Sequence, residues 1–133
     1  MNRKTAKIGS VMAAAAAMTV ALIGPAYAAG PSGAEACPAG NFCLYYNSPG
    51  YGWGSFEHWS LGSYDLSKYT FRDWGNGSGY GQVAANNAAS AVNNTGDEWG
   101  ICAAAGCEVF RPGFAGALPS DIANKDLSMA YMG

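Results

Sequence analysis

Short runs of apolar residues, separated by glycine, proline and asparagine, follow one another along the chain after residue 36. Runs of this length and spacing predict short β-strands, and no stretch of useful length has the period of a helix. The clearest run is 42–46, Phe-Cys-Leu-Tyr-Tyr, which the turn residues Asn-Ser-Pro-Gly follow at 47–50. Aromatic residues then alternate with glycine from Tyr51 to Phe56, which predicts a further strand with a kinked corner. Such a pattern is typical of an all-β sandwich or barrel.

Later segments are less uniform. Residues 62–71 fit either a strand or a short helical turn, and periodicity does not decide between them. Residues 73–81, Asp-Trp-Gly-Asn-Gly-Ser-Gly-Tyr-Gly, have the composition of an exposed loop. Strands are again predicted at 91–93 and 107–110.

The first 28 residues have the pattern of a secretory signal peptide. Residues 1–7 carry three basic side chains, residues 10–24 are almost all small or apolar, and 25–28 supply an Ala-x-Ala cleavage site. The apolar run is too short to span a bilayer comfortably. We therefore expect cleavage after Ala28, a flexible N-terminus over 29–36, and a secreted, extracellular protein without a membrane contact.

Removal of this segment changes the charge. Four basic and nine acidic residues remain, so the net charge goes from −2 to −5. A nucleic-acid partner requires the opposite balance, and the remaining cations form no cluster. These cations are Lys68, Arg72, Arg111 and Lys125. We expect no nucleic-acid partner.

All four cysteines follow the predicted cleavage site, where export exposes them to an oxidising environment. Four cysteines allow three pairings. Cys37 lies close to Cys43, and Cys102 close to Cys107, which favours two local disulfides that each stabilise by about 2 kcal/mol. A zinc site built from both pairs is the alternative. Secretion and the absence of a Cys-x-x-Cys spacing disfavour it.

A shorter copy of the segment 37–54 recurs at 102–116, with the same order of cysteine, apolar strand, Pro-Gly corner and aromatic-x-Gly. In addition, Asn-Lys-Asp-Leu-Ser at 124–128 occupies the place that Asn-Asn-Ala-Ala-Ser has at 86–90. An internal duplication explains both matches. We predict one domain over 37–133, with repeat one at 37–96 and repeat two at 97–133.

These motifs resemble known families. Tyr46, four residues and Tyr51, followed by a Gly-rich corner, resemble the aromatic corner of βγ-crystallin Greek keys. Residues 86–90 resemble the calcium signature of that family. The opening Cys-Pro-x-Gly-x-x-Cys-Leu-Tyr at 37–45, together with 86–90, resembles bacterial peptidase inhibitor family I36, whose founding type is a streptomycete inhibitor of metalloproteases. The resemblance implies a disulfide-stapled, βγ-crystallin-like sandwich of two Greek-key motifs. Trp53 departs from the pattern because glycine is usual there.

The same resemblance implies a secreted protease inhibitor that acts on metalloproteases and is not an enzyme. The candidate inhibitory loop is Cys102-Ala103-Ala104-Ala105-Gly106-Cys107. A disulfide around four residues would hold an extended, protruding segment rigid, so that binding costs little ordering entropy. By analogy with the founding type, Cys102–Ala103 is the bond offered to the protease. Thermolysin-like enzymes favour a bulkier residue than Ala103 in the primed-side pocket. A purely structural staple is the alternative.

Five residues are candidate calcium ligands by the same resemblance: Asn86, Asn87, Ser90, Asn124 and Ser128. Calcium prefers six to eight oxygen ligands, and its affinity follows the number of carboxylates. The first turn has no carboxylate, and the second has Lys125 at the acidic position. We expect weak calcium binding or none, and no other cofactor.

The remaining chemistry is sparse. His58 is the only histidine, and no motif places a nucleophile beside it. The four tryptophans, at 53, 59, 74 and 99, fit a packed core better than a sugar-binding surface, with Trp74 the most exposed. The alternatives to an inhibitor are a non-inhibitory βγ-crystallin-type domain that binds calcium weakly or cell-wall glycans, and a small antimicrobial toxin. We expect a monomer.

Overall fold

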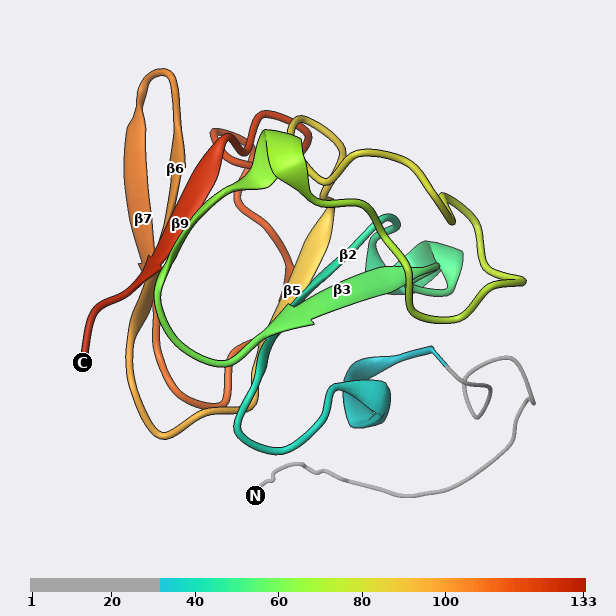
Figure 1. Ribbon diagram of the computed structural model, residues 1–133, viewed down its shortest axis with the longest axis horizontal. Helices are drawn as coiled ribbons and strands as arrows, with labels where there is room; N and C mark the ends of the chain where they lie inside the picture. Colours follow the sequence, from blue (N-terminus) through green and yellow to red (C-terminus); the bar gives the residue numbers. More distant parts are fainter. Residues whose placement is uncertain (1–31) are drawn as a thin grey trace. The chain divides into compact units, whose positions relative to one another are not determined.

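A computed structural model describes residues 32–133; the predicted signal peptide, 1–28, and residues 29–31 lie outside the described residues. Within 32–133 the regular structure consists of β-strands and short 3-10 turns, without an α-helix (Figure 1). The strands form two four-stranded antiparallel sheets, which confirms the all-β prediction. In this part of the chain no helix has the length and apolar character needed to cross a membrane.

Each sheet has a simple order. The first sheet consists of β3 (Phe56–Trp59), β2 (Phe42–Tyr45), β5 (Ser90–Asn93) and β8 (Ala115–Ala117). The second consists of β4 (Ser63–Asp65), β9 (Ser128–Tyr131), β6 (Trp99–Ala103) and β7 (Gly106–Phe110). Of the first four strands along the chain, β2, β3 and β5 lie in the first sheet and β4 lies in the second. Of the last four, β6, β7 and β9 lie in the second sheet and β8 lies in the first. The two halves of the chain therefore have the same strand order.

The corner after β2 differs from the predicted strand. Pro49–Tyr51 form a 3-10 turn, and β3 begins only at Phe56. Gly52, Trp53 and Gly54 have φ angles of 82°, 65° and 77°, which no extended strand can have. Trp53 thus has the left-handed backbone conformation for which glycine is the usual residue.

The ambiguous segment 62–71 contains both of the structures that its pattern allowed. Ser63–Asp65 form β4, and Leu66–Lys68 form a 3-10 turn directly after it. The carboxylate of Asp65 accepts a hydrogen bond from the backbone N–H of Ser67 (3.0 Å) and caps this turn.

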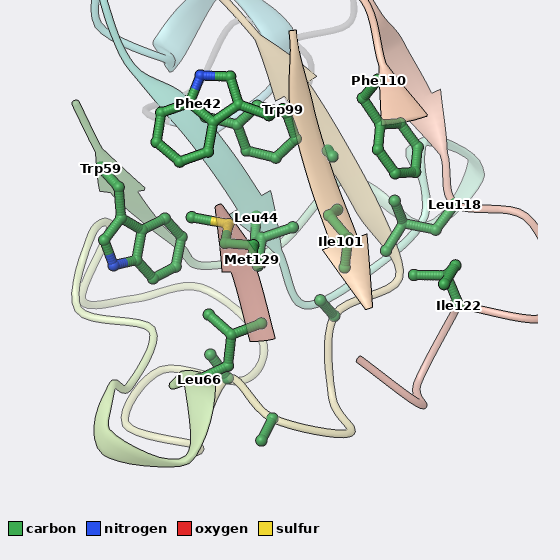
Figure 2. Close-up of a cluster of buried hydrophobic side chains, with 14 of the residues drawn as sticks. Phe42, Leu44, Trp59, Leu66, Trp99, Ile101, Phe110, Leu118, Ile122 and Met129 are labelled. Carbon is green, nitrogen blue, oxygen red and sulfur yellow. The ribbon is translucent and has the colours of Figure 1, made fainter. Parts of the chain in front are cut away.

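The main core lies between the two sheets, as Figure 2 shows. The rings of Phe42 and Trp99, which come from different sheets, stack with their centroids 5.3 Å apart. Residues outside the strands close the ends of this core, among them Leu66, Leu118 and Ile122. Burial of each large apolar side chain contributes about 1.5–3 kcal/mol, so this contact between the sheets is the main source of stability.

The outer face of the first sheet is also covered. Tyr45, Phe56 and Val92 form a second buried cluster there, beneath residues 32–37. The Tyr45 hydroxyl donates a hydrogen bond to the Gly33 carbonyl (2.8 Å), and the Cys37–Cys43 disulfide ties the segment to β2. The described part of the predicted flexible N-terminus, 32–36, is therefore packed against the sheet. The second sheet has no such cover in the described part of the chain.

Two of the tryptophans confirm the core prediction. Trp59 and Trp99 are buried in the main core. Trp53 and Trp74 are half-buried and pack against the second cluster. We expected Trp74 to be the most exposed, but its ring packs against Gly77 of the same loop.

The glycine-rich loop 73–81 is less exposed than its composition suggested. A Cβ atom on Gly79 would overlap the ring of Tyr46, and one on Gly77 would lie 2.6 Å from Oγ of Ser55. The backbone N–H of Ser55 donates to the carbonyl of Ser78 (2.9 Å). The loop therefore packs closely over the chain that connects β2 and β3.

Candidate functional site

The candidate inhibitory loop is a tight β-hairpin. Strand β6 continues to Ala103 and β7 begins at Gly106, so only Ala104 and Ala105 form the turn. Cys102 and Cys107 lie opposite each other in the two strands, and a disulfide joins them with their Cα atoms 3.9 Å apart. Both disulfides are the local pairings that the sequence favoured. The expected extended segment is a turn because strand pairing continues beyond the disulfide.

The tip of this hairpin is accessible. Ala104, Ala105 and Gly106 are exposed, and Ala103 is half-buried. In Figure 1 the orange loop between β6 and β7 stands clear of the neighbouring strands.

The Cys102–Ala103 peptide bond lies inside the second sheet, because β6 has a neighbour on each side. The carbonyl oxygen of Cys102 accepts a hydrogen bond from the backbone N–H of Leu127 (2.8 Å). A protease that attacked this bond would first have to displace that hydrogen bond. The bond that the resemblance assigned to the protease is therefore less accessible than the tip.

Strand β7 forms one edge of the second sheet. Pairs of residues in an antiparallel ladder alternate between hydrogen-bonded and non-hydrogen-bonded. Since the Cys102 carbonyl bonds toward β9, Cys102 and Cys107 form a non-hydrogen-bonded pair. The backbone N–H and C=O groups of Cys107 and Val109 are consequently directed away from β6, toward the open edge.

The outer face of the second sheet contains an apolar hollow of about 550 Å³. The Cys102–Cys107 disulfide lines it together with Val109 and Met132, whose side chains are 50% and 55% exposed. The hollow is therefore continuous with the hairpin and lies beside the open edge of β7.

The predicted calcium residues do not all lie together. Asn86, Asn87 and Asn124 line a second hollow, of about 480 Å³. Ser90 is buried, and its hydroxyl donates to the backbone carbonyl of Asn47 (2.6 Å), whereas Ser128 lines the apolar hollow on the second sheet. No aspartate or glutamate among the described residues lines the second hollow. Residues 32–133 contain no cluster of three or more histidine, cysteine, aspartate or glutamate side chains that could hold a metal ion.

The turns that carry these asparagines bind each other. Asn86 and Asn124, at equivalent places in the two motifs, both have left-handed φ angles, of 65° and 59°. The backbone N–H of Asn86 donates to the carbonyl of Asp126, and that of Asn124 donates to the carbonyl of Ala88, both at 2.8 Å. This reciprocal pair of hydrogen bonds holds the two turns together.

Sequence reasoning missed Asp126, which lies between these turns and is fully buried. One carboxylate oxygen accepts a hydrogen bond from the backbone N–H of Ala88 (3.2 Å), and the other has no partner among the described residues. Burial raises the pKa of this carboxyl group to about 7, against the opposing effect of the hydrogen bond from Ala88. The only signal in the sequence was its central place in the repeated motif.

His58 lies on β3 with its Nδ1 atom 2.7 Å from a carboxylate oxygen of Asp73. Its neighbour Glu57 pairs instead with Arg72 (3.6 Å), and burial raises the pKa of Glu57. Both contacts join β3 to the neighbouring segment at residues 72 and 73.

The chain was compared with known protein families, curated proteins and solved structures, and the family comparison gave a match. The sequence model of peptidase inhibitor family I36 matches residues 30–109, a range that contains both disulfides and the 86–90 turn. No curated protein and no solved structure matched the chain. Since the family match covers more than half of its residues, the chain belongs to peptidase inhibitor family I36, which makes it an inhibitor of peptidases and not an enzyme.

Proposed function

We propose that the protein is secreted and inhibits a metalloprotease by presenting the tip of the β6–β7 hairpin. The observation that carries this proposal is the Cys102–Cys107 disulfide one residue pair below the exposed turn. A turn clamped at its base loses little conformational entropy on binding. The two disulfides and the inhibitor family fit an extracellular protein, and we propose cleavage after Ala28 and a monomeric inhibitor.

The open edge of β7 offers a second contact. Extended segments bind to exposed sheet edges through backbone hydrogen bonds, with side-chain pockets supplying specificity. The free backbone groups of Cys107 and Val109, beside the apolar hollow, suit an extended strand of the protease. In this arrangement the Leu127 hydrogen bond protects the Cys102–Ala103 bond from cleavage.

For the fold, we propose that the two halves of the chain are the two Greek keys of a βγ-crystallin-like sandwich. The support is the exchange of β4 and β8 between the sheets and the left-handed Asn86 and Asn124 at equivalent places.

The first prediction concerns inhibition. We expect the protein without residues 1–28 to inhibit a thermolysin-like metalloprotease. Ala104→Asp should raise the inhibition constant at least about tenfold, because disrupting the contact of the hairpin tip with the protease costs about 1.4 kcal/mol or more of binding free energy. The measurement is the rate of peptide hydrolysis across metallo-, serine and cysteine proteases.

Ala115→Asp is the matched control, because Ala115 is exposed on β8 at an edge of the other sheet. It should leave the inhibition constant unchanged. Absence of inhibition of every protease class at micromolar inhibitor would contradict the proposal, and equal effects of both substitutions would exclude the hairpin as the contact.

The second prediction concerns calcium. Because no carboxylate of the described residues lines the hollow that holds Asn86 and Asn124, we expect a dissociation constant in the millimolar range or weaker. Titration calorimetry and the melting temperature in calcium, magnesium or chelator provide the measurement. A micromolar dissociation constant for calcium would contradict this prediction and would show that backbone and amide oxygens suffice for tight calcium binding.

A further inference from the structure

The hollow between the two asparagine turns, here called the amide hollow, is lined largely by asparagine and tyrosine residues. Its volume of about 480 Å³ falls within the usual range for small-ligand sites, about 300–1,000 Å³. The lining residues include Asn47, Tyr51, Asn86, Asn87 and Asn124. None of them carries a charge, and four of them are asparagines.

We propose that the amide hollow binds an uncharged saccharide. A primary amide offers two donors and one acceptor, and can therefore bond both ways with hydroxyl groups, which also donate and accept. A lining without charge offers little to a phosphate, a carboxylate or a divalent cation. Among small polar ligands, neutral polyols match this set of groups.

The side-chain amides of Asn86 and Asn124 are available to a ligand. Neither side chain makes a hydrogen bond to another residue within 32–133, whereas the Asn87 amide donates to the carbonyl of Val83 (2.9 Å) and that of Asn47 to the carbonyl of Tyr51 (3.3 Å). The oxygen atoms of these last two amides remain as acceptors. The hollow therefore presents donors and acceptors at Asn86 and Asn124, and further acceptors at Asn47 and Asn87.

The hollow is also preorganised. The reciprocal backbone hydrogen bonds at Asn86 and Asn124 fix both turns, and the Ser90 hydroxyl holds the Asn47 backbone from below. Binding of a ligand would consequently require little ordering of these turns, and such ordering is what weakens binding to mobile loops.

Tyr51 supplies an aromatic surface at this site. Its side chain is 81% exposed, the most exposed large apolar or aromatic side chain of the described residues. An aromatic ring presents a flat apolar face with a polar tip, which suits the C–H face of a pyranose ring beside its hydroxyl groups. No core packing accounts for Tyr51, because the main core and the second cluster both exclude it.

The test is a titration of the isotope-labelled protein with three neutral trisaccharides: chitotriose, cellotriose and maltotriose. We expect at least one of them to shift the side-chain amide signals of Asn86 and Asn124, with a dissociation constant in the millimolar range or tighter. Tyr51→Ala should weaken binding about tenfold. Asn124→Gly, which keeps the left-handed backbone, should weaken it severalfold.

Tyr80→Ala is the control, because Tyr80 is also exposed but does not line the hollow. It should bind the saccharide as the unchanged protein does, and all three variants should retain protease inhibition. The proposal is overturned if none of the trisaccharides shifts these signals, or if the shifts lie elsewhere on the surface. It is also overturned if Tyr80→Ala weakens binding as much as Tyr51→Ala, or if calcium shifts the signals and the sugars do not.

Discussion

Replacing Gly79 with alanine should lower the free energy of unfolding by about 3 kcal/mol, the largest effect that we expect from adding a single methyl group to this protein. Two costs combine. The new Cβ would overlap three atoms of Tyr46, so that side chain must leave its place against the ring of Phe71. In addition, Gly79 has a φ angle of 82°, which costs an alanine about 1 kcal/mol.

Gly81→Ala separates these two costs. Gly81 has nearly the same φ angle, 83°, but a Cβ there would meet no atom within 4 Å. Gly81→Ala should therefore lower the free energy of unfolding by only about 1 kcal/mol. Denaturant unfolding measures this quantity for both variants. Equal losses for the two variants would mean that loop 73–81 does not pack on Tyr46.

The second large effect concerns Asp126, whose replacement by asparagine should stabilise the protein near neutral pH. The folded-state pKa of about 7 lies above the ordinary value of 3.8, so the folded protein binds a proton more tightly than the unfolded chain. The resulting stabilisation is complete below pH 3.8, declines as the pH rises, and is lost above about pH 7. The amide of the substituted side chain would keep the acceptor for the N–H of Ala88 and would carry no charge.

One pKa unit corresponds to about 1.4 kcal/mol, so we expect the advantage of Asp126→Asn to be about 3 kcal/mol larger at pH 7.5 than near pH 4. Unfolding by denaturant at both values measures this difference. Asp65→Asn is the control: the hydrogen bonds from Ser67 lower the pKa of Asp65, so its contribution is lost on acidification, the opposite sign. Parallel pH curves for Asp126→Asn and the unchanged protein would contradict the prediction.

These two residues illustrate how the loops carry much of the specific structure. Gly79 was placed in an exposed loop because of its composition, and Asp126 was only the centre of a turn motif. Both are in fact packed against residues far away in the sequence, Tyr46 and Ala88. Composition reports how polar a segment is, but it does not report which distant backbone the segment approaches.

Several features followed from the sequence alone. Short apolar runs between turn residues predicted an all-β domain, and the strands at 42–45, 90–93 and 106–110 lie close to the predicted ranges. The spacing of the cysteines favoured the two disulfides that the structure contains. The opening motif and the 86–90 turn led to the correct family. These inferences succeeded because strand periodicity, loop closure and short motifs depend on residues that are neighbours in the chain.

Only the tertiary structure decided where those elements meet. It made the loop 102–107 a hairpin beside an open edge, since β6 pairs on its other side with β9, which follows much later in the chain. It covered the outer face of the first sheet and left that of the second open. It also brought Tyr51, Asn86 and Asn124 to one hollow. These arrangements depend on pairing and packing between distant segments, which no local pattern of residues encodes.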